Sequence, residues 1–159
     1  MAYRMKMIAA SVVMSFTAIT ASAEAQIYHV EQNYNLKQAS KAVVVKNWEQ
    51  ASKYLKRATK NSLANEQLQA ALIDLCAIDY TLGRLESAKE ACDRAIRVNR
   101  KAWQAFYNRG HVYRALGQKK AAAADYTKSL ALNPNEPKIH TTLQIMLETT
   151  VNKYAENKK

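Results

Sequence analysis

The sequence predicts an all-α protein in which pairs of helices repeat along the chain. Three observations predict this. The 159 residues include only 3 Gly and 2 Pro, too few for the turns of a many-stranded sheet. Apolar residues recur at helical spacing, as Leu72, Leu75 and Cys76 do. The sequence from residue 69 onward also matches itself at an offset of 34 residues, which indicates stacked helical repeats.

The start of the chain is predicted to be a signal peptide, residues 1–23. Arg4 and Lys6 give it a basic start, Met7 to Thr20 is largely apolar, and a small-x-small cleavage pattern ends at Ala23. The apolar run is shorter than the roughly 20 residues of a membrane-spanning helix, which favours cleavage over an uncleaved anchor. We therefore expect export to the periplasm of a Gram-negative bacterium, or secretion, without stable membrane insertion. Residues 24–35 are predicted to be a flexible leader.

The chain is strongly basic, with a formal net charge of +11. Loss of Arg4 and Lys6 with the signal peptide removes two of these charges and leaves +9. The remaining basic residues are interpreted as a diffuse, solvated surface that keeps the protein soluble. We expect no nucleic-acid partner, because an exported chain rarely meets nucleic acid.

The period of 34 residues is clearest at two Leu-Gly pairs. Leu82-Gly83 recurs as Leu116-Gly117, and at the same offset small residues fall on small ones and large apolar residues on large ones. In each copy one apolar helical stripe ends at the Leu-Gly pair and a second begins after it. The glycines are predicted to form the turn, since glycine adopts a positive φ without a side-chain clash. Each copy is therefore predicted to be a hairpin of two helices.

Residues 103–136 closely resemble the tetratricopeptide repeat (TPR). That family's pattern has large, small and aromatic residues at fixed places, then Leu-Gly, Ala, an aromatic residue, a small residue and Pro. The matching residues here are Phe106, Gly110, Tyr113, Leu116, Gly117, Ala122, Tyr126, Ser129 and Pro134. Residues 69–102 match less fully, because Cys76 stands in the place of Gly and Asp79 in the place of an aromatic residue, but the period is intact.

Two further segments complete the predicted architecture. Residues 36–68 are a degenerate repeat, whose second helix matches the period at an offset of 37 and whose first helix is expected around Leu36 to Val45. The residues that match are Trp48, Ala51, Leu55 and Ala58. Residues 137–159 are predicted to form a capping helix, which covers the exposed end of the stack, and a polar tail. The predicted fold is a TPR-like α-α superhelix with a C-terminal capping helix.

The resemblance implies a concave groove that holds a peptide or helix of a partner protein. Carried over onto this chain, the groove residues are Ile73, Ala77, Tyr80, Tyr107, Asn108, His111, Arg114, Lys138 and Thr141. We hypothesise that an extended partner segment places an acidic group or terminal carboxylate on Arg114 and His111. Its apolar side chains would contact Ile73 and Tyr80. The alternatives are a face covered only by solvent and a face buried in self-association.

Arg109 and Asp125 are predicted to form a structural ion pair. They occupy the places of Leu75 and Ala91 in the preceding copy, so a charged pair and an apolar pair exchange together. Arg109 lies eight residues before Gly117 and Asp125 eight residues after it, which makes them face each other in an antiparallel hairpin. Loss of one partner would leave a partly buried charge uncompensated.

Cys76 and Cys92 are a candidate disulfide. They lie on the two helices of one repeat, seven residues before Gly83 and nine after it, and helical side chains tilt towards the N-terminus of their own helix. An oxidising compartment favours such a bond. The alternative is two buried thiols that fill small core positions. Redox catalysis is not expected, because the sequence has no Cys-x-x-Cys.

The sequence contains no motif for catalysis. It lacks a glycine-rich phosphate loop, His-Glu-x-x-His and Gly-x-Ser-x-Gly. His29, His111 and His140 are not at ligand spacing, so neither a metal nor a cofactor is expected. Four carboxylates are assigned to solvated helix surfaces: Asp74, Asp79, Glu86 and Glu90.

The sequence thus predicts a non-catalytic protein-interaction scaffold or adaptor of the bacterial cell envelope. One alternative is an electrostatic binder of an anionic envelope surface, for which binding would fall steeply with added salt. The other is an enzyme with an unrecognised site, which the lack of a convergent acid, base or nucleophile disfavours.

Overall fold

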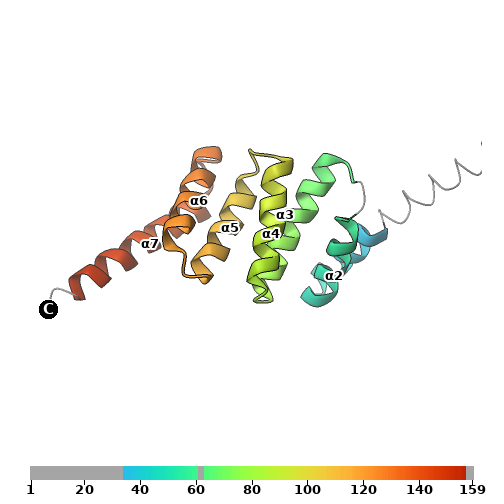
Figure 1. Ribbon diagram of the computed structural model, residues 1–159, viewed down its shortest axis with the longest axis horizontal. Coiled ribbons are helices and arrows are strands. Elements are labelled where there is room, and N and C mark those ends of the chain that lie inside the picture. Colours follow the sequence, from blue (N-terminus) through green and yellow to red (C-terminus); the bar gives the residue numbers. More distant parts are fainter. Residues whose placement is uncertain (1–33, 61–62, 157–159) are drawn as a thin grey trace, which may run out of the picture.

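A computed structural model of the chain describes residues 34–60 and 63–156 (Figure 1). The predicted signal peptide and most of the predicted leader lie outside the described residues. A first helix spans residues 34–44. It is followed by α2 (Trp48–Ala58), α3 (Asn65–Thr81), α4 (Leu85–Val98), α5 (Trp103–Ala115), α6 (Lys119–Leu132) and α7 (Pro137–Glu156). The prediction of an all-α, TPR-like superhelix is confirmed.

The helices stand side by side in chain order and form a row of antiparallel hairpins (Figure 1). Within a repeat α3 packs on α4 and α5 on α6, while α3 also contacts α5, so the first helices of successive repeats are neighbours. Helix α7 packs on α6 and extends away from the stack. None of the described helices is long and apolar enough to cross a membrane.

Small residues bring the helices close together. Ala51, Ala88 and Ala122 recur at the same place in the three repeats, and each is fully buried. Larger side chains such as Leu72 and Leu75 fill the space around them. Because alanine has only a methyl side chain, the backbones of facing helices approach closely there, and each repeat buries its apolar face against its neighbour.

Two predicted boundaries differ from the structure. Residues 34 and 35, the last two of the predicted leader, belong to the first helix, and Asn35 is buried. The boundary predicted between residues 68 and 69 falls inside α3, which begins at Asn65. A period fixes the length of a repeat but not its first residue, and in the first turn of α3 only Leu68 is apolar.

The three turns within the repeats share one backbone geometry, although only two contain glycine. Gly83 and Gly117 have φ of 72° and 74°, and Lys46, at the equivalent place of the first repeat, has φ of 55°. In each turn the next residue donates its backbone N–H five residues back, as Arg84 does to the Asp79 carbonyl at 2.8 Å and Asn47 to the Ala42 carbonyl at 2.8 Å. These are the bonds of a Schellman helix end, which favours glycine.

We expect Lys46→Gly to stabilise the protein. A lysine in the left-handed region carries a steric penalty of roughly 1 kcal/mol that glycine avoids, and part of the gain is lost to the larger entropy of the unfolded chain. The free energy of unfolding in urea should therefore rise by about 0.5 kcal/mol. Lys41→Gly, in the middle of the same helix, is the control and should lower it. A decrease for Lys46→Gly would contradict the turn geometry.

Cys76 and Cys92 form a disulfide bond between α3 and α4, with their Cα atoms 5.3 Å apart. Both side chains are fully buried in the hairpin. The bond closes a short loop, 16 residues apart in sequence, and a loop of this length contributes about 3 kcal/mol by restricting the unfolded chain. It joins the two helices of a single repeat and leaves the interfaces between repeats to packing and polar contacts.

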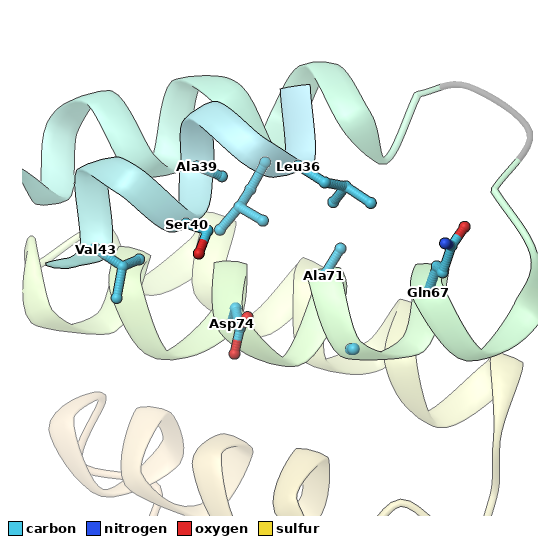
Figure 2. Close-up of a pocket in the computed structure, with 9 residues that line it drawn as sticks. Leu36, Ala39, Ser40, Val43, Gln67, Ala71 and Asp74 are labelled. Atoms are coloured by element: carbon cyan, nitrogen blue, oxygen red, sulfur yellow. The ribbon is translucent and has the colours of Figure 1, made fainter. Parts of the chain in front are cut away.

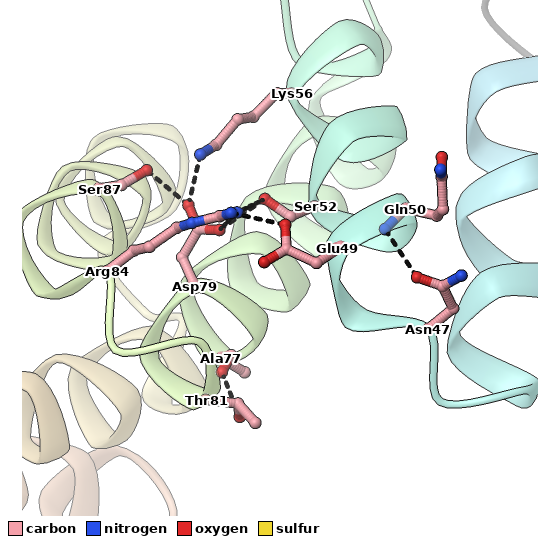
Figure 3. A network of polar contacts seen from close by, with 10 residues as sticks. All are labelled: Asn47, Glu49, Gln50, Ser52, Lys56, Ala77, Asp79, Thr81, Arg84 and Ser87. Carbon is pink, nitrogen blue, oxygen red and sulfur yellow. Dashed lines mark hydrogen bonds and ion pairs between the residues drawn. The ribbon is translucent and has the colours of Figure 1, made fainter.

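A buried carboxylate, Asp79, links the first two repeats (Figure 3). Its assignment to a solvated surface was wrong, because Asp79 is 0% exposed. Ser52 of α2 donates a hydrogen bond to Oδ1 at 2.6 Å, Ser87 of α4 donates to Oδ2, and the Lys56 ammonium lies 2.9 Å from Oδ2. Burial acts to raise the pKa of Asp79, but these donors outweigh it and hold the pKa below its ordinary value.

Arg109 links the second and third repeats. Its Nε and Nη2 donate to both oxygens of Asp125, at 2.7 and 2.8 Å, and its Nη1 donates to Asp93 at 2.6 Å. The predicted partners therefore do face each other, and Asp93 of α4 is an additional partner from the preceding repeat. The hydrogen bond with Asp125 is the main cause that raises the pKa of Arg109 above its ordinary value.

Candidate functional site

A pocket lies between α3 and α5, the first helices of the second and third repeats. Its cavity volume is about 320 Å³. It is lined by Ala77, Tyr80 and Thr81 from α3 and by Tyr107, Asn108, His111 and Arg114 from α5. We refer to these seven residues as the α3–α5 pocket. On α5 they follow the spacing i, i+1, i+4 and i+7, which places them along one face of the helix.

Aromatic rings form the inner wall of the α3–α5 pocket. The ring of His111 lies 4.5 Å from that of Tyr107, 5.9 Å from that of Tyr80 and 5.3 Å from that of Tyr126, measured between centroids. Tyr126 comes from α6 and passes over Gly110, where a Cβ atom would lie only 2.6 Å from its ring. Only glycine leaves room for this ring, so the Gly-aromatic pair of the repeat positions the pocket wall.

The hydroxyl of Tyr126 is buried and makes no hydrogen bond to the described residues. Burial is the main cause that raises the pKa of Tyr126 well above its ordinary value, so the hydroxyl keeps its proton. The ring of Tyr126 packs against the rings of Tyr107 and His111, which both line the pocket. A buried donor without an acceptor is costly, and a ligand or water that reached it would gain a hydrogen bond.

The charge in the pocket belongs to Arg114 and not to His111. Burial, and to a smaller extent the positive charge of Arg114, lower the pKa of His111 to about 4. The imidazole is therefore neutral at pH 7, with Nδ1 3.4 Å from Nη2 of the exposed Arg114. The pocket thus offers apolar ring faces beside a single exposed guanidinium.

Six of the nine predicted groove residues meet in this pocket. Ile73 lies on the same helix but packs against an apolar cluster with Leu72 and Ala95, and its carbonyl accepts a weak hydrogen bond from Asn108 at 3.5 Å. Lys138 and Thr141 are exposed on α7, and the Thr141 hydroxyl donates to the carbonyl of Pro137 in its own helix. These three residues do not line the pocket.

Three other residues matter here that the sequence did not predict. Thr81 lines the pocket one turn after Ala77, and the buried ring of Tyr126 packs against the ring of His111, which lines the pocket. Thr142 of α7 is buried, with its hydroxyl 3.0 Å from the Tyr107 hydroxyl, so it fixes the position of that ring. It is the neighbour of the predicted Thr141, and one residue rotates a helical side chain by about 100°.

A second pocket of about 280 Å³ lies on the other side of α3, against the first helix (Figure 2). Leu36, Ala39, Ser40 and Val43 face Ala71, Gln67 and Asp74 across it. The two pockets follow successive stretches of α3, residues 67–74 and 77–81. A face with two neighbouring hollows of this kind suits an extended chain better than a small compact molecule.

The α3–α5 pocket is lined by side chains that are suited to binding another protein. Tyrosine and arginine, which line it, are the side-chain types that most often dominate protein interfaces. Among residues 34–60 and 63–156, no group of three or more His, Cys, Asp or Glu side chains is placed to hold a metal ion.

The hairpin that supplies half of the pocket matches a known family. Residues 103–136 match the family model of the tetratricopeptide repeat. The protein carries a tetratricopeptide repeat. No curated protein sequence matches the chain. Gly110, Tyr126 and the Leu116-Gly117 turn all lie within the matched residues.

Solved TPR structures have the same fold at low sequence identity. The TPR domain of Arabidopsis OM64 is 23% identical over 72% of this chain and 93% of that domain, with a TM-score of 0.67. The second TPR domain of human RPAP3, in complex with the HSP70 peptide SGPTIEEVD, is 20% identical over 75% and 97%, with a TM-score of 0.67. A tetratricopeptide repeat protein from Parabacteroides merdae is 23% identical over 77% and 48%, with a TM-score of 0.68.

Proposed function

We propose that this protein is a non-catalytic interaction scaffold that binds an extended segment of a partner protein in the α3–α5 pocket. The observation that carries this proposal is the convergence of Tyr80, Tyr107 and Arg114 from two successive repeats on one cavity. The RPAP3 domain of the same fold is in complex with a peptide, which supports a peptide ligand for this chain.

The partner segment is proposed to carry a carboxylate beside an apolar side chain. Arg114 is the exposed cation of the pocket, and a guanidinium binds a carboxylate through two parallel hydrogen bonds. His111 contributes its neutral ring to the wall instead of a second charge, which changes its role from the one first hypothesised. The apolar side chain would contact the rings of Tyr80 and Tyr107 in place of Ile73.

The cell envelope is the proposed location. The predicted signal peptide supports it, and so does the Cys76–Cys92 bond, because disulfides form and persist in oxidising compartments. The groove is therefore proposed to be an adaptor surface for envelope proteins.

We expect Tyr107→Ala/Arg114→Ala to abolish capture of the partner. The two changes remove an aromatic contact and the exposed cation, and interface residues of these types often contribute 2 kcal/mol or more each, roughly a thirtyfold loss of affinity. The measurement is crosslinking in intact cells with the mature chain as bait, followed by quantification of the captured proteins. The circular dichroism spectrum should stay unchanged.

The matched control is Tyr34→Ala/Arg97→Ala, which removes the same two residue types from exposed positions outside the pocket. It should capture the partner as the unchanged protein does. Equal capture by both double variants would dismiss the α3–α5 pocket as the binding site. A loss of capture only above moderate salt would instead favour the electrostatic alternative.

A further inference from the structure

The net positive charge of the described residues is concentrated in the first repeat. Residues 34–60 contain seven Lys and Arg and a single acidic residue, Glu49, for a net charge of +6. Residues 63–156 contain thirteen basic and ten acidic residues, for a net charge of +3 over a much longer stretch. The expectation of a diffuse basic surface was therefore wrong. A local excess of this size attracts anions to one end of the molecule.

Four of the basic side chains near this end line a single pocket. It has a volume of about 590 Å³ and lies between α2 and the turn that joins α3 to α4. Its residues are Glu49, Gln50, Ser52, Lys53, Lys56, Arg57 and Arg84. We refer to it as the α2 pocket. It shares no residue with the α3–α5 pocket, so what it binds is independent of the proposed function.

Asp79 holds two of the four cations in place (Figure 3). The Lys56 ammonium lies 2.9 Å from its Oδ2, and Arg84 Nη1 lies 3.8 Å from its Oδ1, while Arg84 Nη2 also pairs with Glu49. Both cationic side chains remain 40% exposed. Their charged ends are thus fixed from the protein side and open to solvent on the other, so a ligand meets groups that are already ordered.

Lys53 and Arg57 supply the free charge. They lie four residues apart on α2, so their side chains project from neighbouring positions of one helix face. Both are exposed, and among the described residues neither takes part in an ion pair. The pocket's four cations outnumber Glu49 and Asp79 by two. The excess matches one doubly charged anion.

We propose that the α2 pocket binds a phosphate-type dianion. Arg57 offers a planar guanidinium fork that matches the oxygens of a phosphate, and Lys53, Lys56 and the anchored Arg84 add positive charge in the same pocket. The phosphate is either free in solution or the terminal phosphate of a lipid headgroup. Asp79 acts only as a positioning residue, because it lies beneath the cations and does not face the ligand.

The test is a titration of the ¹⁵N-labelled protein with inorganic phosphate at constant ionic strength, followed by amide chemical shifts. Saturable shifts are expected at α2 and around Arg84, and Lys53→Gln/Arg57→Gln should weaken the binding at least tenfold. Lys119→Gln/Lys120→Gln is the matched control, since it removes two charges from exposed positions of α6 outside the pocket. It should leave the affinity unchanged.

A second arm identifies the source of the phosphate, by sedimentation with phosphatidylcholine vesicles that contain or lack phosphatidic acid. Binding that requires phosphatidic acid and is lost only in Lys53→Gln/Arg57→Gln supports the same site with a lipid ligand. The proposal is overturned if neither inorganic phosphate nor the vesicles bind. It is also overturned if both double variants lose binding equally, because the effect would then be one of net charge alone.

Discussion

Arg109→Leu should lower the free energy of unfolding by about 3–5 kcal/mol, because it leaves the carboxylate of Asp125 buried without its cation. Asp125 is 6% exposed and receives two hydrogen bonds from the guanidinium. The variant also removes the stacking of Arg109 over Phe106 and Tyr113, at 5.5 and 5.6 Å from the ring centroids. Urea unfolding followed by circular dichroism measures the change.

The preceding repeat supplies the control for this prediction. Leu75 and Ala91 stand there in the places of Arg109 and Asp125, and both are buried. The double variant Arg109→Leu/Asp125→Ala recreates that apolar pair and removes the stranded carboxylate, while Asp93 keeps Lys89 as a partner at 3.0 Å. It should be about 2 kcal/mol more stable than Arg109→Leu alone. A double variant less stable than the single one would show that Asp125 is not the group left uncompensated.

Asp79→Asn should lower the free energy of unfolding by roughly 3 kcal/mol. An amide keeps the shape of the side chain but removes the charge that pairs with Lys56, and its NH₂ group meets donors from Ser52 and Ser87. Glu86→Gln, on the exposed surface of α4, is the matched control and should change the stability little. Equal stability of the unchanged protein and Asp79→Asn would contradict the network.

The difference between the unchanged protein and Asp79→Asn should depend on pH. The pKa of Asp79 in the folded protein lies below the ordinary value of 3.8, so the unfolded chain takes up a proton first as the pH falls. The stabilisation by the carboxylate is therefore complete well above pH 4 and is lost as the pH falls through the folded pKa. Unfolding free energies compared between pH 7 and pH 3 should show the two proteins converging. A constant difference would exclude Asp79 as the titrating group.

The repeat period predicted those features that depend on the comparison of one copy with the next. It located the hairpins, the turns at Gly83 and Gly117, and the exchange of Leu75 and Ala91 for Arg109 and Asp125. The resemblance to the TPR family located the groove on the first helix of each hairpin, and six of the nine residues carried over from it meet in one pocket. These are properties of a single helix or a single hairpin, and a sequence records them locally.

Contacts between repeats could not be predicted in the same way. Asp79 has partners in α2, in α4 and in the turn before α4, and the spacing of Ser52 and Ser87 in the sequence does not mark them as a set. One signal for this network was available in the sequence. Asp79 stands at a position of the TPR pattern where the next copy has an aromatic residue, Tyr113, and a carboxylate at a buried aromatic position requires hydrogen-bond donors around it. The turn at Lys46 was missed for a related reason, since the residue itself does not indicate a positive φ.

The disulfide has a consequence for the order in which the chain gains its structure. A stack of repeats can begin to form at any unit and grow to either side, and growth starts where a single unit is least unstable by itself. Cys76 and Cys92 close the middle hairpin and no other. Once the disulfide has formed, we expect folding of the stack to begin at that hairpin. The first and third repeats then pack against its two sides.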